Sequence, residues 1–263
     1  MWCNTQIGIT SHGGHNILVR DNNIHRNRSQ VSDSGKCLNR ANTEISQHWE
    51  GGATKFKWTT NLRFINNRVH DGYGSGIWLD IDNFGAIVRN NTVTNNQYGS
   101  GIYQEAGWLP VDQSTLPAKL SQGAPYAYSA LIENNTVNGC GRVDNRGFPW
   151  EAGLQVAAST DVIVRNNTVN NCFAGVSIVS QDRLDTPSLV SQVSGQNGYS
   201  VRRVTFSNNR VFGSNIITAF DDNGDSAMYG PSGVRFTNNT TDQATVFHWN
   251  GQRPGSLAGW VRR

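Results

Sequence analysis

The sequence predicts an all-β solenoid, in which one chain winds into a coil of about seven rungs of short parallel strands. Three observations predict this fold. A short phrase recurs seven times along the 263 residues, its apolar residues alternate as in a strand, and the composition disfavours helices. The chain has 31 Asn and 28 Gly but only 4 Lys, and Asn and Gly are poor helix formers. We expect a single domain over 1–263, with rungs over about 7–241 and a C-terminal cap over about 242–263.

The composition also excludes several classes of protein. A net charge of +3 is too weak a positive balance for a nucleic-acid surface. No apolar run is long enough to cross a membrane. We therefore expect neither a nucleic-acid partner nor a membrane span, and we expect no organic cofactor.

The recurring phrase is an apolar stretch, an Asn pair and a second apolar stretch. Its leading residues are spaced by 45, 24, 44, 32, 42 and 30 positions. The shortest spacing is close to one turn of a solenoid, so the longer spacings contain insertions. The phrase occupies 18–24, 63–69, 87–93, 131–137, 162–169, 204–211 and 234–240.

Each phrase predicts two short strands that meet at an Asn corner. Asn tolerates the left-handed backbone conformation better than other non-Gly residues, and stacked Asn amides can bond to one another between rungs. A third strand, which opens with Gly in most rungs, is expected over 8–9, 76–80, 101–105, 153–157 and 175–179. The first strand of each phrase points these residues inward: Val19, Phe64, Val88, Ile132, Val164, Phe206 and Phe236.

On these motifs the chain resembles the right-handed parallel β-helix proteins of the pectin-lyase-like superfamily, over about residues 7–241. The stretch from Glu50 to Arg183 is similar to a common type of secreted bacterial β-helix protein. The resemblance implies a right-handed coil and an extracellular location. The superfamily contains polysaccharide lyases, glycoside hydrolases, epimerases and phage tailspikes, so the motifs are specific for architecture and not for chemistry. The Asn-Thr-Asp, Gly-His-Gly and Arg-Ile-Lys hallmarks of the polygalacturonase branch are not found in this sequence.

Equal positions on successive third strands form columns, because parallel strands stack about 4.8 Å apart. One outward column is expected to contain His12, Glu50, Asp80, Glu105, Ala157 and Val179. Its neighbour is expected to contain Thr10, His48, Trp78, Tyr103, Gln155 and Ser177. Insertions at 51–60, 106–127, 181–200 and 222–232 follow the same strand and would wall this face as a groove.

The predicted groove suits an extended sugar chain. His48, Trp78 and Tyr103 are candidate substrate-binding residues within it. Trp108 and Trp150 lie in or beside insertions and are further candidates, with loop anchoring as the alternative. The acidic column has an alternative too, as a solvated face that loop arginines balance.

The leading hypothesis for the chemistry is a polysaccharide lyase acting on an acidic glycan. Glu50, Asp80 and Glu105 would hold a cation, and hard oxygen ligands suit Ca²⁺. Lys55 or Lys57 would remove a proton and Arg183 would stabilise charge. The β-helix lyases that this sequence resembles use a Lys/Arg pair with acidic metal ligands.

Two alternatives remain open. A glycoside hydrolase would use two of the same acids, since adjacent rungs give about 5 Å and alternate rungs about 9–10 Å between carboxylates. A non-catalytic glycan-binding or adhesin-like module would need the aromatic column and not the acids.

The cysteines and the chain ends complete the predictions. Cys140 and Cys172 share one register position, so the pair is either a disulfide or a buried thiol stack. Cys3 and Cys37 are a second candidate pair, and either bond favours an extracellular setting. The sequence begins inside the first rung, so we expect a truncated fragment, an N-terminal partner segment or burial in a homo-oligomer.

Overall fold

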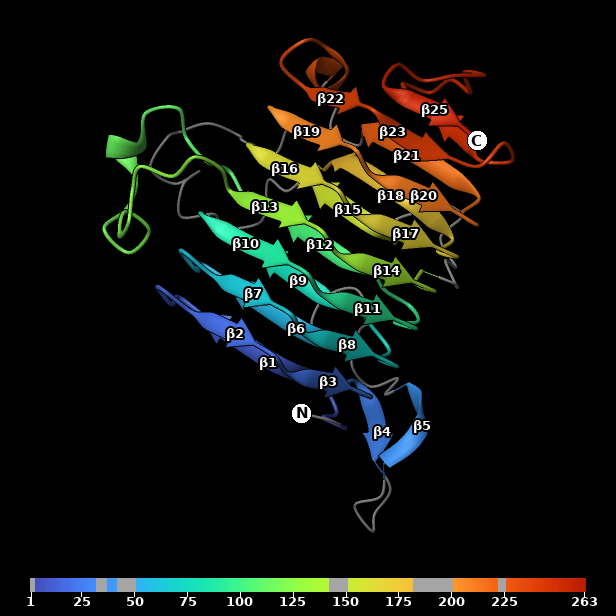
Figure 1. The fold of residues 1–263 in the computed structure, drawn as a ribbon. Coiled ribbons are helices and arrows are strands. Elements are labelled where there is room, and N and C mark those ends of the chain that lie inside the picture. Colours follow the sequence, from blue (N-terminus) through green and yellow to red (C-terminus); the bar gives the residue numbers. More distant parts are fainter. Residues whose placement is uncertain (1–2, 32–36, 42–50, 142–150, 182–200, 222–225) are drawn as a thin grey trace.

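The structure is a computed structural model that describes residues 3–31, 37–41, 51–141, 151–181, 201–221 and 226–263. The chain visits three parallel sheets in turn and returns to each one strand further along (Figure 1). The described residues thus form one coil, with the two ends of the chain at its opposite ends (Figure 1). This confirms the all-β solenoid that the repeated phrase predicts.

The three sheets contain 8, 7 and 8 strands. Sheet 1 contains β1 (Ile7–His12), β6 (Gly52–Lys57), β9 (Ile77–Asp80), β12 (Ile102–Glu105), β15 (Ala152–Ala157), β18 (Ala174–Ser180), β21 (Ile216–Asp221) and β24 (Val246–His248). Sheet 2 contains β2 (Leu18–Arg20), β7 (Arg63–Ile65), β10 (Ala86–Arg89), β13 (Ala130–Glu133), β16 (Val162–Arg165), β19 (Val204–Ser207) and β22 (Val234–Thr237). Sheet 3 contains β3 (Asn23–His25), β8 (Arg68–His70), β11 (Thr92–Thr94), β14 (Thr136–Asn138), β17 (Thr168–Asn170), β20 (Arg210–Phe212), β23 (Asn239–Thr241) and β25 (Trp260–Arg262).

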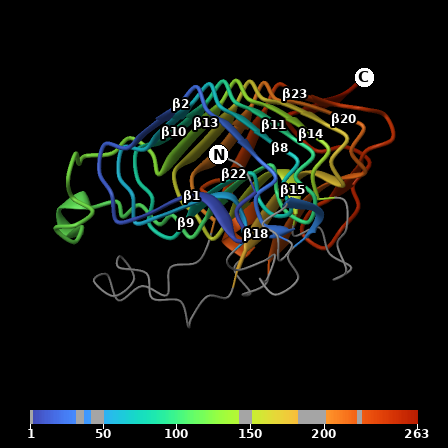
Figure 2. The same ribbon diagram turned by 90° about the horizontal axis from the view of Figure 1, so that it is seen from below.

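The remaining elements are small. An antiparallel pair, β4 (Ser29–Val31) and β5 (Cys37–Ala41), projects beside the first rung. Two single-turn 3₁₀ helices, η1 (Gln113–Thr115) and η2 (Ser226–Tyr229), lie in insertions. In the described part of the chain, no helix is long and apolar enough to span a membrane. The insertion at 106–129 projects from one edge of the coil (Figure 2).

The Asn pair has two separate roles at the corner between sheets 2 and 3. The first residue of each pair adopts the left-handed conformation with its side chain outside, as Asn134 does with φ at 57°. The second Asn, which is buried in every pair except the first, bonds to its equivalent on the next rung. Asn135 illustrates the pattern: its backbone N and Nδ2 both donate to Asn167 Oδ1, at 2.9 and 3.0 Å. The ladder runs through Asn22, Asn67, Asn91, Asn135, Asn167, Asn209 and Asn239.

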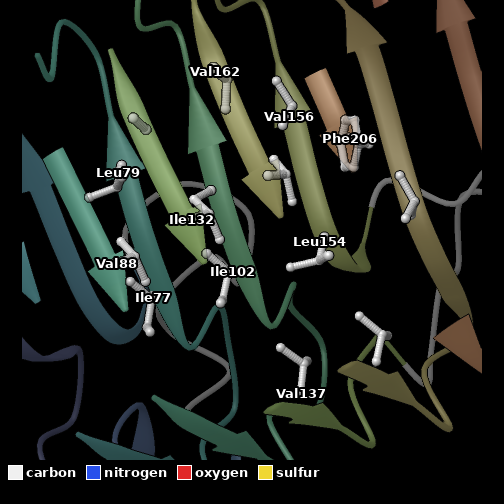
Figure 3. Close-up of a cluster of buried hydrophobic side chains, with 14 of the residues drawn as sticks. Ile77, Leu79, Val88, Ile102, Ile132, Val137, Leu154, Val156, Val162 and Phe206 are labelled. Carbon is white, nitrogen blue, oxygen red and sulfur yellow. The ribbon is translucent and has the colours of Figure 1, made fainter. Parts of the chain in front are cut away.

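The interior of the coil is one continuous apolar core. The inward residues of sheets 1 and 2 interdigitate there, and Figure 3 shows Ile77, Ile102 and Ile132 among them. Of the predicted inward residues of sheet 2, all except the half-buried Phe236 belong to the buried core. Each such side chain contributes about 1.5–3 kcal/mol by leaving water.

The glycines that open the third strands are required by close packing. A Cβ at Gly101 would lie 2.3 Å from Val137 Cγ1, and one at Gly153 would lie 2.3 Å from Val169 Cγ1. Sheets 1 and 3 approach so closely here that only a residue without a side chain fits. This is the physical reason for the Gly-apolar phrase that marks the third strand in the sequence.

Of the two alternatives for Cys140 and Cys172, the disulfide is present, and both residues are buried. Cys3 is also disulfide-bonded. The side chain of its predicted partner, Cys37, lies outside the described part of the structure.

Replacing Cys140 and Cys172 together with Ala is expected to lower the free energy of unfolding by about 2–4 kcal/mol, because the bond restricts the unfolded chain. Chemical denaturation followed by circular dichroism measures this loss. Unfolding of the double variant at the wild-type denaturant concentration would show that the bond adds nothing to stability.

The C-terminal residues continue the coil. β24 adds an eighth strand to sheet 1, and β25 pairs with β23 at the end of sheet 3. Phe247 and Trp260 belong to the buried core, and Trp249 packs against it. The predicted C-terminal cap over about 242–263 thus contains two strands.

Candidate functional site

The outward residues of sheet 1 form two columns, because its strands pair in parallel register. The first column contains Thr10, Lys55, Trp78, Tyr103, Gln155, Ser177 and Thr218. The second column contains His12, Lys57, Asp80, Glu105, Ala157, Val179 and Phe220. The sequence placed most of these residues correctly, including the aromatic pair and two of the acids.

The second rung is a correction. Lys57, not Glu50, pairs in register with Asp80, and Lys55 takes the position that was assigned to His48. The assignment failed because Ala53 and Thr54 stand where the first rung has Gly8 and Ile9, and the Thr54 hydroxyl donates to Gly76 O. Phe56, which pairs in register with Leu79 and is buried in the core, is the apolar residue that identifies this strand.

Five side chains on β6, β9 and β12 make mutual contacts, and we call them the central cluster: Lys55, Trp78, Asp80, Tyr103 and Glu105. The ammonium of Lys55 lies 3.2 Å from Asp80 Oδ2 and 3.9 Å from the centre of the Trp78 ring. Trp78 Nε1 donates to Glu105 Oε2 at 2.9 Å. The Trp78 and Tyr103 rings are stacked, with centroids 5.6 Å apart.

All five members of the central cluster are buried, with 3–9% of their surface exposed. Two carboxylates on adjacent strands would repel each other and resist burial. Lys55 offsets the charge of Asp80, and the indole N–H satisfies an oxygen of Glu105. The sequence predicted the carboxylates and the aromatic pair side by side and named Lys55 as a candidate base, but it did not predict the place of Lys55 in the aromatic column.

Among the described residues of the two columns, the lysines and carboxylates lie on three adjacent strands, β6, β9 and β12. Beyond β12 the second column turns apolar, and Ala157 and Val179 pack with the stacked aromatic pair. The next residues of the first column, Gln155 and Ser177, are buried and uncharged. Beyond β12 the described residues of both columns up to β21 are therefore uncharged, so the central cluster lies at the border between a charged and an uncharged part of this face.

The predicted calcium ligands do not come together in the described part of the chain. That part contains no group of three or more His, Cys, Asp or Glu residues placed to hold a metal ion. The third place in the acidic column belongs to Lys57, and the Lys55 ammonium already lies against Asp80. This donor set does not fit Ca²⁺, which takes six to eight oxygen ligands.

The other predicted site residues are not in the central cluster. Trp108 packs against the insertion core, an apolar cluster formed by Phe84, Leu109, Leu116, Leu120 and Tyr126. It therefore anchors the insertion at 106–129. His48, Glu50, Trp150 and Arg183 lie outside the described residues, and their roles stay predictions.

A second charged cluster lies on sheet 2. Glu133 receives Arg89 Nε on one carboxylate oxygen and Arg165 Nε on the other, at 2.5 and 2.6 Å. Burial opposes ionisation of Glu133, but the two arginines outweigh it and lower its pKa. Both oxygens are used within the protein, so this cluster stabilises neighbouring rungs and offers no reactive group.

A family model described as a right handed beta helix region matches residues 2–117. The match covers the coil from β1 to β12, which includes the whole central cluster, and the same three sheets continue beyond it. The chain is a right-handed parallel β-helix. Comparisons of this β-helix with curated proteins and with solved structures gave no match. Its chemistry must therefore be argued from its own residues.

Proposed function

We propose that this β-helix is a carbohydrate-active enzyme that binds a polysaccharide along the outer face of sheet 1 and cleaves it at the central cluster. One observation carries the proposal: Asp80 and Glu105 occupy adjacent register positions beside the stacked rings of Trp78 and Tyr103. Aromatic rings with a few convergent polar groups are typical of small-ligand sites.

Hydrolysis is the reaction that this geometry favours. Adjacent parallel strands are about 4.8 Å apart, and retaining glycosidases hold their two carboxyl groups about 5–5.5 Å apart. The two acids also have different neighbours. Lys55 compensates the charge of Asp80, while Glu105 accepts an indole hydrogen bond. Different surroundings are what a nucleophile and a proton donor require.

The lyase remains the second candidate, because two lysines stand directly beside the acids. Lys55 contacts Asp80, and Lys57 shares its column. A lysine that lost its proton would remove the C5 proton of a uronate, and the second ammonium would neutralise the uronate carboxylate. The C4–O bond to the neighbouring sugar would break as the C4–C5 double bond forms, and the leaving oxygen would take a proton from water. The predicted help from Ca²⁺ and Arg183 is a separate proposal that this mechanism does not need.

The third candidate, a glycan-binding module, would use the stacked rings of Trp78 and Tyr103 and not the acids. Trp78 is 3% exposed and Asp80 is 5% exposed, so a sugar reaches the rings or the carboxylates only when the cluster opens. A module would need that opening for binding alone, with no proton transfer to follow.

An activity panel separates the three candidates. Acidic and neutral polysaccharides are incubated with the protein, with and without Ca²⁺ and chelator, while reducing ends and ultraviolet absorbance of unsaturated ends are followed. We expect new reducing ends without absorbance, insensitive to chelator. Absorbance that rises with the reducing ends would select the lyase, and binding with neither signal would select the module.

An extracellular location is part of the proposal. The Cys140–Cys172 bond and the disulfide of Cys3 support it, because disulfides persist in oxidising compartments. A secreted enzyme would also meet its polymeric substrate directly.

A further inference from the structure

A second polar cluster lies at the end of the same column, outside the central cluster. His12 ends β1, Lys57 ends β6, and Trp58 follows it. The ammonium of Lys57 lies 4.5 Å from the centre of the Trp58 ring, and that of Lys119 lies 4.6 Å from it. The His12 ring meets Trp58 edge-on, with centroids 4.3 Å apart. We call these four residues the basic cluster.

Lys119 reaches this cluster from a distant part of the sequence. It belongs to the insertion at 106–129, where Leu116 and Leu120 on either side are buried in the insertion core. Its chain lies against Gly13, where a Cβ would be only 2.5 Å from Lys119 Cε. The insertion and the glycine together bring a third basic residue to the end of β1 and β6.

The basic cluster concentrates positive charge in a chain that has little of it. Three of the four lysines, Lys55, Lys57 and Lys119, are found on this part of the coil. Lys55 is paired with Asp80. Within the described part of the structure, no acidic residue forms an ion pair with Lys57 or Lys119.

The titration of His12 is consistent with this field. Burial lowers the pKa of His12, and the charges of Lys57 and Lys119 lower it further. Three groups that each carry or accept a positive charge therefore converge on one indole. Cation–π contacts with Trp58 offset part of their repulsion, and an anion between them would offset more.

We propose that His12, Lys57, Trp58 and Lys119 form a binding subsite for an anionic sugar, through the carboxylate or sulfate of that sugar. The proposal rests on the function proposed above and deepens it by naming the substrate class as an acidic glycan. The second column reads His12, Lys57, Asp80, Glu105, so the subsite lies one strand from the carboxylates. A glycan bound along the column places its anionic group on the lysines and a neighbouring linkage at the acids.

Calorimetric titration of oligosaccharides tests the subsite without relying on turnover. The probes are a carboxylated, a sulfated and a neutral oligosaccharide of equal length, measured in a Glu105→Gln background that blocks cleavage. Lys57→Gln and Lys119→Gln are each expected to weaken binding of the charged probes by about five- to tenfold, the usual worth of a charge-assisted contact. The neutral probe should be unaffected. Comparison of the two charged probes identifies the preferred anion.

Two further variants control this experiment. Arg68→Gln removes the same charge from an exposed position of β8, on another sheet, and should leave all three affinities unchanged. Lys119→Arg keeps the charge and should retain most of the binding. Equal losses with charged and neutral probes, or none with the charged probes, would overturn the subsite.

The pH dependence gives an independent readout. Because the pKa of His12 is lowered by burial and by Lys57 and Lys119, the ring takes up its proton at a lower pH than an ordinary histidine. Affinity for the charged probes should therefore rise as the pH falls and His12 is protonated, and His12→Gln should remove the rise. The stability of the free protein should change in the opposite direction to the affinity. Protonation of His12 between Lys57 and Lys119 destabilises the folded state, so the free energy of unfolding falls as the pH falls.

The outcomes distinguish the subsite from the enzyme. Lysine-dependent binding of acidic sugars without any cleavage would support the subsite and contradict the proposed enzyme. The opposite outcome is cleavage of an acidic substrate that depends on Asp80 and Glu105. If Lys57→Gln and Lys119→Gln leave this cleavage unchanged at subsaturating substrate, the enzyme is supported and the subsite is contradicted.

Discussion

Asp80→Asn and Glu105→Gln are each expected to lower polysaccharide cleavage by about 10²–10⁴-fold, the usual contribution of a positioned acid or base. Both changes keep the size of the side chain and remove its ability to carry charge or transfer a proton. Initial rates of reducing-end formation measure the loss. Binding of the same glycan should change much less, because the stacked Trp78 and Tyr103 remain in place.

Asp21→Asn is the matched control for this experiment. Asp21 is exposed at the left-handed first position of its phrase, where the other six phrases have Asn. The change is the same as that at Asp80, and activity should stay at the wild-type level. Full activity in either Asp80→Asn or Glu105→Gln would exclude the two-carboxylate mechanism.

Asp80→Asn also leaves Lys55 buried without its carboxylate partner, which by general experience costs about 3–5 kcal/mol. A loss of activity must therefore be separated from a loss of folding. The double variant with Lys55→Gln removes the unpaired charge and should restore the unfolding midpoint without restoring cleavage. Recovery of cleavage in the double variant would show that Asp80 serves only to neutralise Lys55.

Asn135→Ala is expected to lower the free energy of unfolding by about 2–5 kcal/mol, because it leaves several buried groups without partners. Asn135 Oδ1 accepts from both the backbone N and Nδ2 of Asn91, and its own Nδ2 donates to Val88 O at 3.0 Å. The alanine removes all of these bonds and also the bond that Asn135 Nδ2 donates to Asn167 Oδ1. Chemical denaturation of both proteins measures the difference.

Asn134→Gly is the control for the ladder. Asn134 precedes Asn135, is exposed and adopts φ at 57°, a conformation that Gly adopts without strain. This variant should unfold close to wild type. A loss at Asn135 no larger than that at Asn134 would mean that the buried amide ladder does not stabilise the coil.

Much of the fold follows from the sequence because each rung repeats the same local constraints. The Asn corner needs a residue that tolerates the left-handed conformation and an amide that bonds to the rung above. The Gly that opens the third strand is needed because sheet 3 packs against it, as at Gly101 and Val137. These requirements recur in most rungs, so they are visible without a structure.

The second rung was misplaced because its strand lacks that local signature. Thr54 occupies an inward position that is apolar in the other rungs, and only the backbone pairing of β6 with β1 and β9 fixes the register. The error placed Glu50 at the position that Lys57 occupies, and so predicted a third acid where the structure has a lysine. The wrong register in this one strand produced three acids and so the prediction of cation binding. The correct register leaves a pair of acids, Asp80 and Glu105.

The sequence by itself determined the architecture, the aromatic and acidic columns and the Cys140–Cys172 pair, because these depend on position within a repeated rung. Only the tertiary structure decided that Lys55 joins Asp80 to Trp78 and that Lys119 meets Lys57 over Trp58. Lys119 lies in an insertion outside the repeat, and its place depends on how the insertion core packs against the coil. Contacts of that kind have no period in the sequence, since packing between distant segments sets them.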